Sequence, residues 1–125
     1  MTRPVVCVVD DDAPLRVALC DLMRSAGYVG LAFATAEEFL AQPIERFDCI
    51  LTDIHMPGLS GLELLQALKT HHAGAAVIIM TADPDKGWRE QAFAGGAEGF
   101  LEKPFDAAVL LKLIARSLGL AGSRS

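Results

Sequence analysis

The chain reads VVCVVDDDAP at residues 5–14, where five apolar residues run directly into three aspartates. An uninterrupted apolar run of this length is typical of a strand that is covered on both faces of a parallel sheet. Asp12 can cap a following helix, and Pro14 suits the first helical turn, where its missing N–H costs nothing. The segment therefore predicts a buried strand, an acidic loop and a helix in direct succession.

The same succession of an apolar run and a helix-like segment recurs along the rest of the chain. Strict alternation of this kind is typical of a parallel α/β sheet with helices on both faces. Right-handed crossovers then favour the doubly wound, flavodoxin-like five-strand order 2-1-3-4-5. The expected strands are Val5–Val9, Tyr28–Phe33, Cys49–Thr52, Ala75–Met80 and Glu98–Glu102. The expected helices lie within 13–27, 35–43, 60–74, 83–95 and 106–119, with the capping pairs Thr35/Glu38 and Ser60/Glu63 at two of their starts.

Length, charge and composition limit what the protein can be. The chain has 125 residues and a formal net charge of −5, so we expect one domain over 4–119 with a frayed tail at 120–125. The negative charge disfavours direct contact with nucleic acid or an anionic membrane, and the apolar runs are far shorter than the roughly 18 residues of a membrane span. The three cysteines Cys7, Cys20 and Cys49 lack metal-like spacing and are expected to be buried thiols of a reduced, cytoplasmic protein.

Polar residues follow every central strand of the predicted sheet. In open parallel sheets the ligand site lies beyond the carboxyl ends of the strands, where the strand order reverses. Crowded carboxylates need raised pKa values or a cation between them, and oxygen ligands without a His or Cys cluster favour Mg²⁺. The residues concerned are Asp10, Asp11 and Asp12 after the first strand, Asp53 after the third, Thr81 after the fourth and Lys103 after the fifth.

Phosphoryl transfer to a carboxylate fits this set of residues. With a cation in place, Asp53 can attack phosphorus as a nucleophile and form an aspartyl phosphate. The transition state spreads negative charge over equatorial oxygens, which Mg²⁺, Lys103 and the Thr81 hydroxyl can contact. Each residue alone has a plainer explanation, since strand-end aspartates are usually turn or cap residues and most lysines are solvated. Asp12 in particular is expected to be a helix cap rather than a metal ligand.

Four stretches of the chain carry further motifs: Val9-Asp10-Asp11-Asp12, the residues from Thr52 to Gly61, Met80-Thr81-Ala82 and the residues from Ala97 to Phe105. Taken together, they resemble the receiver domains of bacterial response regulators in two-component signalling. The resemblance extends from about residue 5 to residue 118, and details such as Pro14 and Lys103-Pro104-Phe105 are most similar to FixJ-type receivers. Leu59 in place of a common Met and the additional Gly96 are small departures that do not touch the chemistry.

The resemblance implies a metal site and a phosphoacceptor. Asp53 would be the phosphoacceptor and also a ligand of Mg²⁺. Asp11 would bind the ion directly and Asp10 through water, and the backbone carbonyl of His55 would complete the protein ligands.

The resemblance also implies residues that respond to the phosphoryl group. Lys103 would pair with it, aimed by a Lys103–Pro104 peptide that is commonly cis in the family, and Thr81 would contact a phosphoryl oxygen after transfer. Phe100 matches an aromatic switch position, although it could equally be a plain core residue. Asp83, like His55, is expected to overhang the site, so that Asp83→Ala changes the rate of autodephosphorylation.

The function that this resemblance implies is a phosphorylation-operated switch. A histidine kinase or histidine phosphotransfer protein would donate the phosphoryl group to Asp53 in a phosphorelay. The surface of helix 83–95, strand 98–102 and helix 106–119 would then change shape and control an output domain or partner, in which a phosphorylation-dependent homodimer could take part. The domain would catalyse its own phosphorylation and dephosphorylation without being a turnover enzyme.

Two other functions stay open at this point. A small phosphatase with an aspartate nucleophile typically needs a second acid two residues further on, where this chain has His55. A phosphate-independent interaction module, or pseudo-receiver, would keep the fold but fail to bind Mg²⁺, and the intact set of site residues speaks against it.

Overall fold

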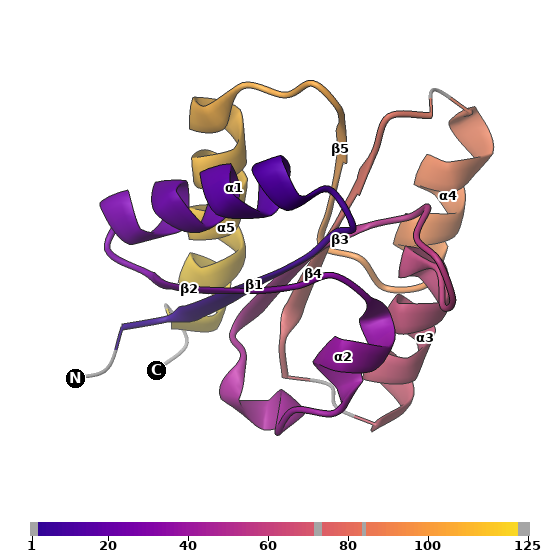
Figure 1. Ribbon diagram of the computed structural model, residues 1–125, viewed down its shortest axis with the longest axis horizontal. Helices are drawn as coiled ribbons and strands as arrows, with labels where there is room; N and C mark the ends of the chain where they lie inside the picture. Colours follow the sequence, from indigo (N-terminus) through magenta and orange to yellow (C-terminus); the bar gives the residue numbers. More distant parts are fainter. Residues whose placement is uncertain (1–2, 72–73, 84, 123–125) are drawn as a thin grey trace.

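A computed structural model describes residues 3–71, 74–83 and 85–122, and it contains one five-stranded parallel sheet (Figure 1). The strand order is β2-β1-β3-β4-β5, which confirms the doubly wound topology. The strands are β1 (Val5–Val9), β2 (Val29–Phe33), β3 (Cys49–Asp53), β4 (Ala76–Thr81) and β5 (Gly99–Glu102). The helices are α1 (Ala13–Ser25), α2 (Ala36–Leu40), α3 (Gly61–His71), α4 (Lys86–Ala94) and α5 (Ala107–Gly122), and the 3-10 helix η1 (Ile44–Arg46) precedes β3.

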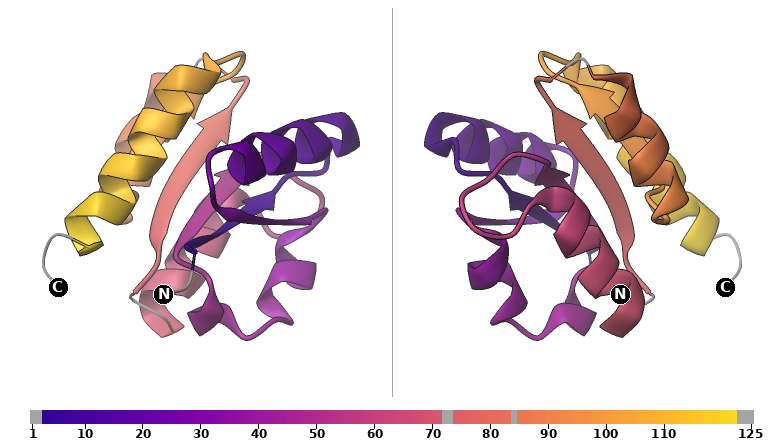
Figure 2. Two further views of the ribbon diagram at one scale, coloured as in Figure 1. Left: turned by 90° about the vertical axis from the view of Figure 1, so that its left-hand side faces the viewer. Right: turned by 90° about the vertical axis from the view of Figure 1, so that its right-hand side faces the viewer.

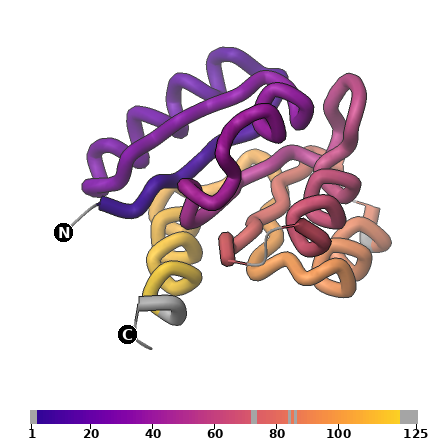
Figure 3. The backbone as a smooth tube through the Cα atoms, turned by 90° about the horizontal axis from the view of Figure 1, so that it is seen from below, coloured from indigo at the N-terminus to yellow at the C-terminus, as the bar shows by residue number. Residues whose placement is uncertain are grey.

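Helices cover both faces of the sheet, as Figure 2 shows from two sides. Along β3 the side chains alternate between two cores, so that Ile50 packs with Leu64 of α3 and Leu51 packs with Met23 of α1 and Leu110 of α5. In Figure 3, α3 and α4 lie side by side on one face. Because β3 is buried on both faces, its first three residues, Cys49, Ile50 and Leu51, form an apolar run in the sequence.

The pairing of the strands brings the polar residues together. β1 and β3 are neighbours with Val9 opposite Thr52, and β4 pairs with β5 with Thr81 opposite Glu102. Residues at or just beyond the carboxyl ends of these parallel strands therefore emerge at one edge of the sheet. The side chains brought to this edge are those of Asp10, Asp53, Thr81 and Lys103.

Several helix boundaries differ from the sequence prediction, and α2, which was expected to run to Pro43, ends at Leu40. The helix expected from residue 83 begins at Lys86, with Asp85 as its cap accepting a hydrogen bond from the Gly87 N–H. The Asp83 carboxylate instead accepts hydrogen bonds from Trp88 Nε1 and from the Asp85 N–H. The last helix continues past the expected end at Gly119 to Gly122. Pro84 and residues 123–125 lie outside the described residues.

Other local predictions are confirmed. The Asp12 carboxylate accepts a hydrogen bond from the Leu15 N–H and caps α1. The three cysteines are buried free thiols, and burial raises the pKa of Cys49 to about 12. Within the described ranges, none of the helices has the length and apolar character that a membrane span would need.

Candidate functional site

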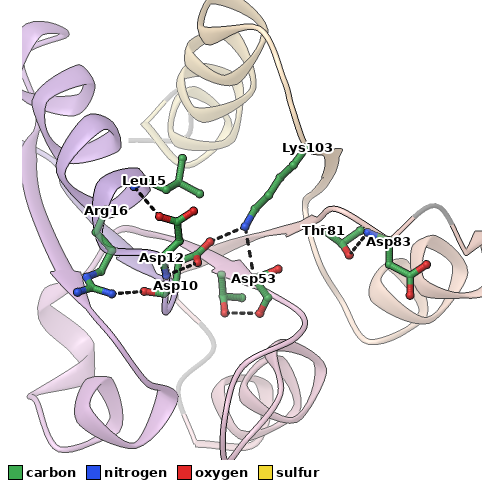
Figure 4. Close-up of polar contacts among 9 residues, drawn as sticks. Asp10, Asp12, Leu15, Arg16, Asp53, Thr81, Asp83 and Lys103 are labelled. Atoms are coloured by element: carbon green, nitrogen blue, oxygen red, sulfur yellow. Dashed lines mark hydrogen bonds and ion pairs between the residues drawn. The ribbon is translucent and has the colours of Figure 1, made fainter.

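Asp10 is fully buried at the end of β1, and both its backbone and its carboxylate are anchored (Figure 4). Its N–H donates to the Phe33 carbonyl at 3.1 Å, and its carbonyl accepts a hydrogen bond of 2.7 Å from Arg16. One carboxylate oxygen accepts from the Asp12 N–H at 2.9 Å, and the other accepts from Lys103 Nζ at 2.7 Å. These contacts fix the position of Asp10 at the start of the acidic loop after β1.

Lys103 joins the two buried carboxylates of the site. Its Nζ lies 2.7 Å from Asp10 Oδ2 and 3.5 Å from Asp53 Oδ2. Burial alone would lower the pKa of Lys103, but the hydrogen bond and charge of Asp10 and the charge of Asp53 outweigh it and raise that pKa. Burial raises the pKa of Asp53, Lys103 acts in the opposite direction, and the charge of Asp10 adds to the increase. The site therefore carries more negative charge than its one lysine balances.

The carboxylates of Asp10, Asp11 and Asp53 offer oxygen atoms that all lie within 4.8 Å of one another. Asp11 is exposed, whereas the other two are buried. Oxygen atoms from a few carboxylates, with a side open to water, are the ligands that Mg²⁺ prefers. The residues present thus fit Mg²⁺, and Asp12 contributes to α1 instead, as predicted. The role of the His55 carbonyl stays a prediction.

A second group of residues lies at the end of β4 beside the acidic site. The buried Thr81 hydroxyl accepts a hydrogen bond of 3.0 Å from the Asp83 N–H. Asp83 Oδ2 accepts from Trp88 Nε1 at 3.0 Å and lies 3.4 Å from His55 Nε2. The rings of His55 and Trp88 pack edge to face, with 5.2 Å between their centroids. We call His55, Asp83 and Trp88 the rim cluster, because it links the loop after β3 to α4.

Phe100 of β5 is half-buried and packs against the core on the α3 and α4 face. The Arg89 guanidinium lies over the rings of both Phe93 and Phe100, and its Cζ is 5.2 and 5.9 Å from their respective centroids. The same residues line a groove of about 370 Å³ between α4, β5 and α5. The position suits either a core aromatic or a mobile switch, so the switch role stays a prediction. The Lys103–Pro104 peptide is cis, as expected.

Two residues at the site were missed by reasoning from the sequence. Gly61 begins α3 so close to β3 that a Cβ there would lie 2.2 Å from the Asp53 carbonyl oxygen, which excludes any side chain. Arg16 lies one turn beyond the cap Asp12, and this spacing was the only signal that it could reach back to the acidic loop.

The fold and the site together define a flavodoxin-like α/β protein with a cluster of carboxylates at the carboxyl edge of its sheet that could hold a cation. More specifically, the chain belongs to the response regulator receiver domain family, whose model matches residues 6–115. This confirms the family resemblance and places the chain among the receiver domains of two-component response regulators.

Individual relatives agree with this assignment. The transcriptional regulatory protein FixJ of Azorhizobium caulinodans is 43% identical over 116 residues, which is 91% of this chain and 54% of that protein. The DNA-binding transcriptional regulator NtrC of Salmonella typhimurium is 39% identical over 94% of this chain and 25% of that protein. The crystal structure of a CheY-like receiver domain protein from Methanospirillum hungatei matches with a TM-score of 0.90 and 28% identity, covering 99% of this chain and 100% of that one. The chain spans about half the length, or less, of these curated relatives.

Proposed function

We propose that this domain accepts a phosphoryl group from a phosphohistidine donor onto Asp53 and thereby switches its surface. The observation that supports this most is the arrangement of Asp53 itself: a buried carboxylate beside two others, with Lys103 Nζ at 3.5 Å. A nucleophilic carboxylate, an oxygen-rich cation site and a fixed positive charge are the parts that phosphoryl transfer to a carboxylate requires.

In the transfer step, the bond from phosphorus to the donor imidazole nitrogen breaks as a bond to an Asp53 oxygen forms. The imidazole leaves with its electron pair. Asp10, Asp11, Asp53 and the His55 carbonyl would hold Mg²⁺, which when bound neutralises charge on the phosphoryl oxygens. Lys103, whose Nζ lies 3.5 Å from Asp53 Oδ2, would supply a further positive charge beside the reacting carboxylate.

After transfer, Thr81 would turn its hydroxyl toward a phosphoryl oxygen. The hydroxyl would then give up its hydrogen bond with the Asp83 N–H, which would release the loop between β4 and α4 that carries Asp83. Phe100 would follow into the vacated space, and the surface of α4, β5 and α5 would change. Such a local electrostatic event is a known way to bias a two-state element.

The same proposal extends to partners and setting. The donor would be a histidine kinase or a histidine phosphotransfer protein in the cytoplasm, and the altered surface would engage an output domain, a partner or a second copy of the chain. FixJ and NtrC are transcriptional regulators, so an output that acts on transcription is in keeping with these relatives. The domain would be a phosphoacceptor rather than a turnover enzyme.

Incubation with acetyl phosphate tests this function by intact-mass measurement. We expect the native chain to gain one phosphoryl group in the presence of Mg²⁺ and none in EDTA. A gain that does not depend on Mg²⁺ would contradict the cation site, and no gain under any condition would favour the phosphate-independent module. Rapid turnover of a generic phosphate ester would favour the phosphatase instead.

We also predict that Asp83→Ala changes the lifetime of the phosphorylated form several-fold. The Asp83 carboxylate lies at the rim of the site, where it can repel the phosphoryl group or orient water. Hydrogen bonds from Trp88 and the Asp85 N–H lower its pKa, so the carboxylate is charged at neutral pH. The measurement is the decay of phosphorylated protein after the donor is removed. Asp83→Asn is the matched control, because it removes the charge but keeps an acceptor for Trp88. An unchanged lifetime in Asp83→Ala would refute the prediction.

A further inference from the structure

Arg16 is the one arginine that reaches the acidic loop in the described part of the chain. It lies on α1, is half-buried, and its Nη1 donates a hydrogen bond of 2.7 Å to the backbone carbonyl of Asp10 (Figure 4). This carbonyl belongs to the peptide group that joins Asp10 to Asp11. The orientation of that peptide group decides in which direction the chain continues, and hence where the Asp11 side chain begins.

The position of the Asp11 carboxylate depends on this backbone contact more than the positions of the Asp10 and Asp12 carboxylates do. The carboxylate of Asp10 is held by the Asp12 N–H and Lys103, and that of Asp12 is held by the Leu15 N–H. Over residues 3–71, 74–83 and 85–122, the Asp11 side chain makes no hydrogen bond or ion pair. Its carboxylate nevertheless lies within 4.8 Å of those of Asp10 and Asp53. The placement of Asp11 is therefore set through its backbone.

We propose that Arg16 is a positioning residue that locks the Asp10–Asp11 peptide, so that both carboxylates converge on the cation. This inference rests on the proposed function, since it concerns the same Mg²⁺ site. Groups that orient metal ligands without touching the metal commonly change metal affinity by roughly 10- to 100-fold when they are removed. Arginine suits the role because it stays charged and its planar fork is pre-organised for hydrogen bonding.

The direction in which Mg²⁺ affinity changes when Arg16 is removed distinguishes a positioning role from a purely electrostatic one. A positive charge near a cation site weakens cation binding, so removing Arg16 would tighten Mg²⁺ binding if charge were its only influence. If Arg16 orients the ligands, its removal weakens binding despite the lost repulsion. Arg24 offers a matched control, because it lies on the same helix with the same charge, pairs with the exposed Asp21, and makes no contact with the acidic loop.

The test is the Mg²⁺ dissociation constant, measured by isothermal titration calorimetry on the native chain, Arg16→Met and Arg24→Met. We expect the dissociation constant to rise roughly tenfold or more in Arg16→Met and to stay the same or fall slightly in Arg24→Met. Arg16→Lys, which keeps a charged donor, should recover part of the affinity. In metal-free protein, the NMR resonance of the Asp11 amide should shift in Arg16→Met and not in Arg24→Met.

Urea unfolding in EDTA shows whether each variant is folded, and Arg16→Gln replaces Arg16→Met if the latter is not. Mg²⁺ affinity equal to or tighter than that of the native chain in the folded variant would overturn the inference and leave the proposed function standing. Equal weakening in Arg24→Met would also overturn it. If the native chain binds no Mg²⁺, the proposed function fails and this inference fails with it.

Discussion

Asp53→Asn is expected to take up no phosphoryl group from acetyl phosphate under conditions in which the native chain gains one. An amide is a far weaker nucleophile than a carboxylate, and it lacks the negative charge that helps to bind the cation. We do not expect the other buried carboxylate of the site, Asp10, to take over the attack, because both of its oxygens are bound, to Lys103 and to the Asp12 N–H. Intact mass measured in the presence of Mg²⁺ gives the result directly.

The matched control for this variant is Asp12→Asn. Asp12 lies in the same acidic loop, but its carboxylate caps α1, and asparagine caps helices about as well as aspartate. We expect Asp12→Asn to be phosphorylated like the native chain. Phosphorylation of Asp53→Asn at the native level would show that another residue is the acceptor.

Asp53→Asn should also make the metal-free fold more stable than the native chain at neutral pH. Burial, and then the charge of Asp10, raise the pKa of Asp53 in the folded chain in spite of Lys103. The folded state thus binds this proton more tightly than the unfolded state, so the free energy of unfolding falls as pH rises from the ordinary aspartate pKa through the raised folded value. Above that value the ionised carboxylate lowers stability, and Asp53→Asn removes this cost.

Urea unfolding in EDTA at several pH values checks this sign. The stability advantage of Asp53→Asn should be present at neutral pH and should shrink as pH falls below the ordinary pKa of aspartate, where the native carboxyl is protonated in both states. Equal or lower stability of the variant at neutral pH would contradict the raised pKa.

The sequence was sufficient to predict the sheet and the edge at which the site lies. The reason is physical: buried parallel strands require continuous apolar runs, and the doubly wound order places the residues after β1 and β3 side by side. Asp10 and Asp53 therefore had to meet once the strand order was known. Lys103 was placed in the same way, from its position directly after β5.

Contacts that depend on the path of a loop could not be predicted in this way. The sequence predicted that the fourth helix starts at residue 83, whereas Asp85 caps α4 and the Asp83 carboxylate accepts a hydrogen bond from Trp88, which no local pattern encodes. The approach of Gly61 to the Asp53 carbonyl and the reach of Arg16 to the Asp10 carbonyl depend on how helices pack on the sheet. These features determine the fine geometry of the site rather than its location.

Lys103→Met is expected to cause the largest loss of stability among substitutions of the charged residues at the site. Removing one partner of a buried ion pair leaves the other charge uncompensated, which costs roughly 3 kcal/mol or more. Asp10, which is 0% exposed, would lose the 2.7 Å contact that holds its Oδ2, and Asp53 would lose its nearest positive charge. Because the pKa of Lys103 is raised, its stabilising charge is fully present below the ordinary lysine pKa and is lost only as pH rises through the raised value, so neutral pH shows the whole effect.

The loss measured for Lys103→Met should depend on Mg²⁺ in a way that a general packing defect would not. Without the lysine, the carboxylates attract a cation more strongly, and a ligand that binds only the folded state stabilises it in proportion to its affinity. We therefore expect Mg²⁺ to restore more stability to Lys103→Met than to the native chain in urea unfolding.

Phosphorylation of Lys103→Met should nevertheless stay slower by roughly a hundredfold, because the bound ion cannot replace the charge that Lys103 supplies to the phosphoryl oxygens. The exposed Lys112 provides the control, since Lys112→Met should leave stability, its response to Mg²⁺ and the phosphorylation rate unchanged. Equal Mg²⁺ responses in Lys103→Met and the native chain would show that Lys103 does not share its carboxylates with the cation.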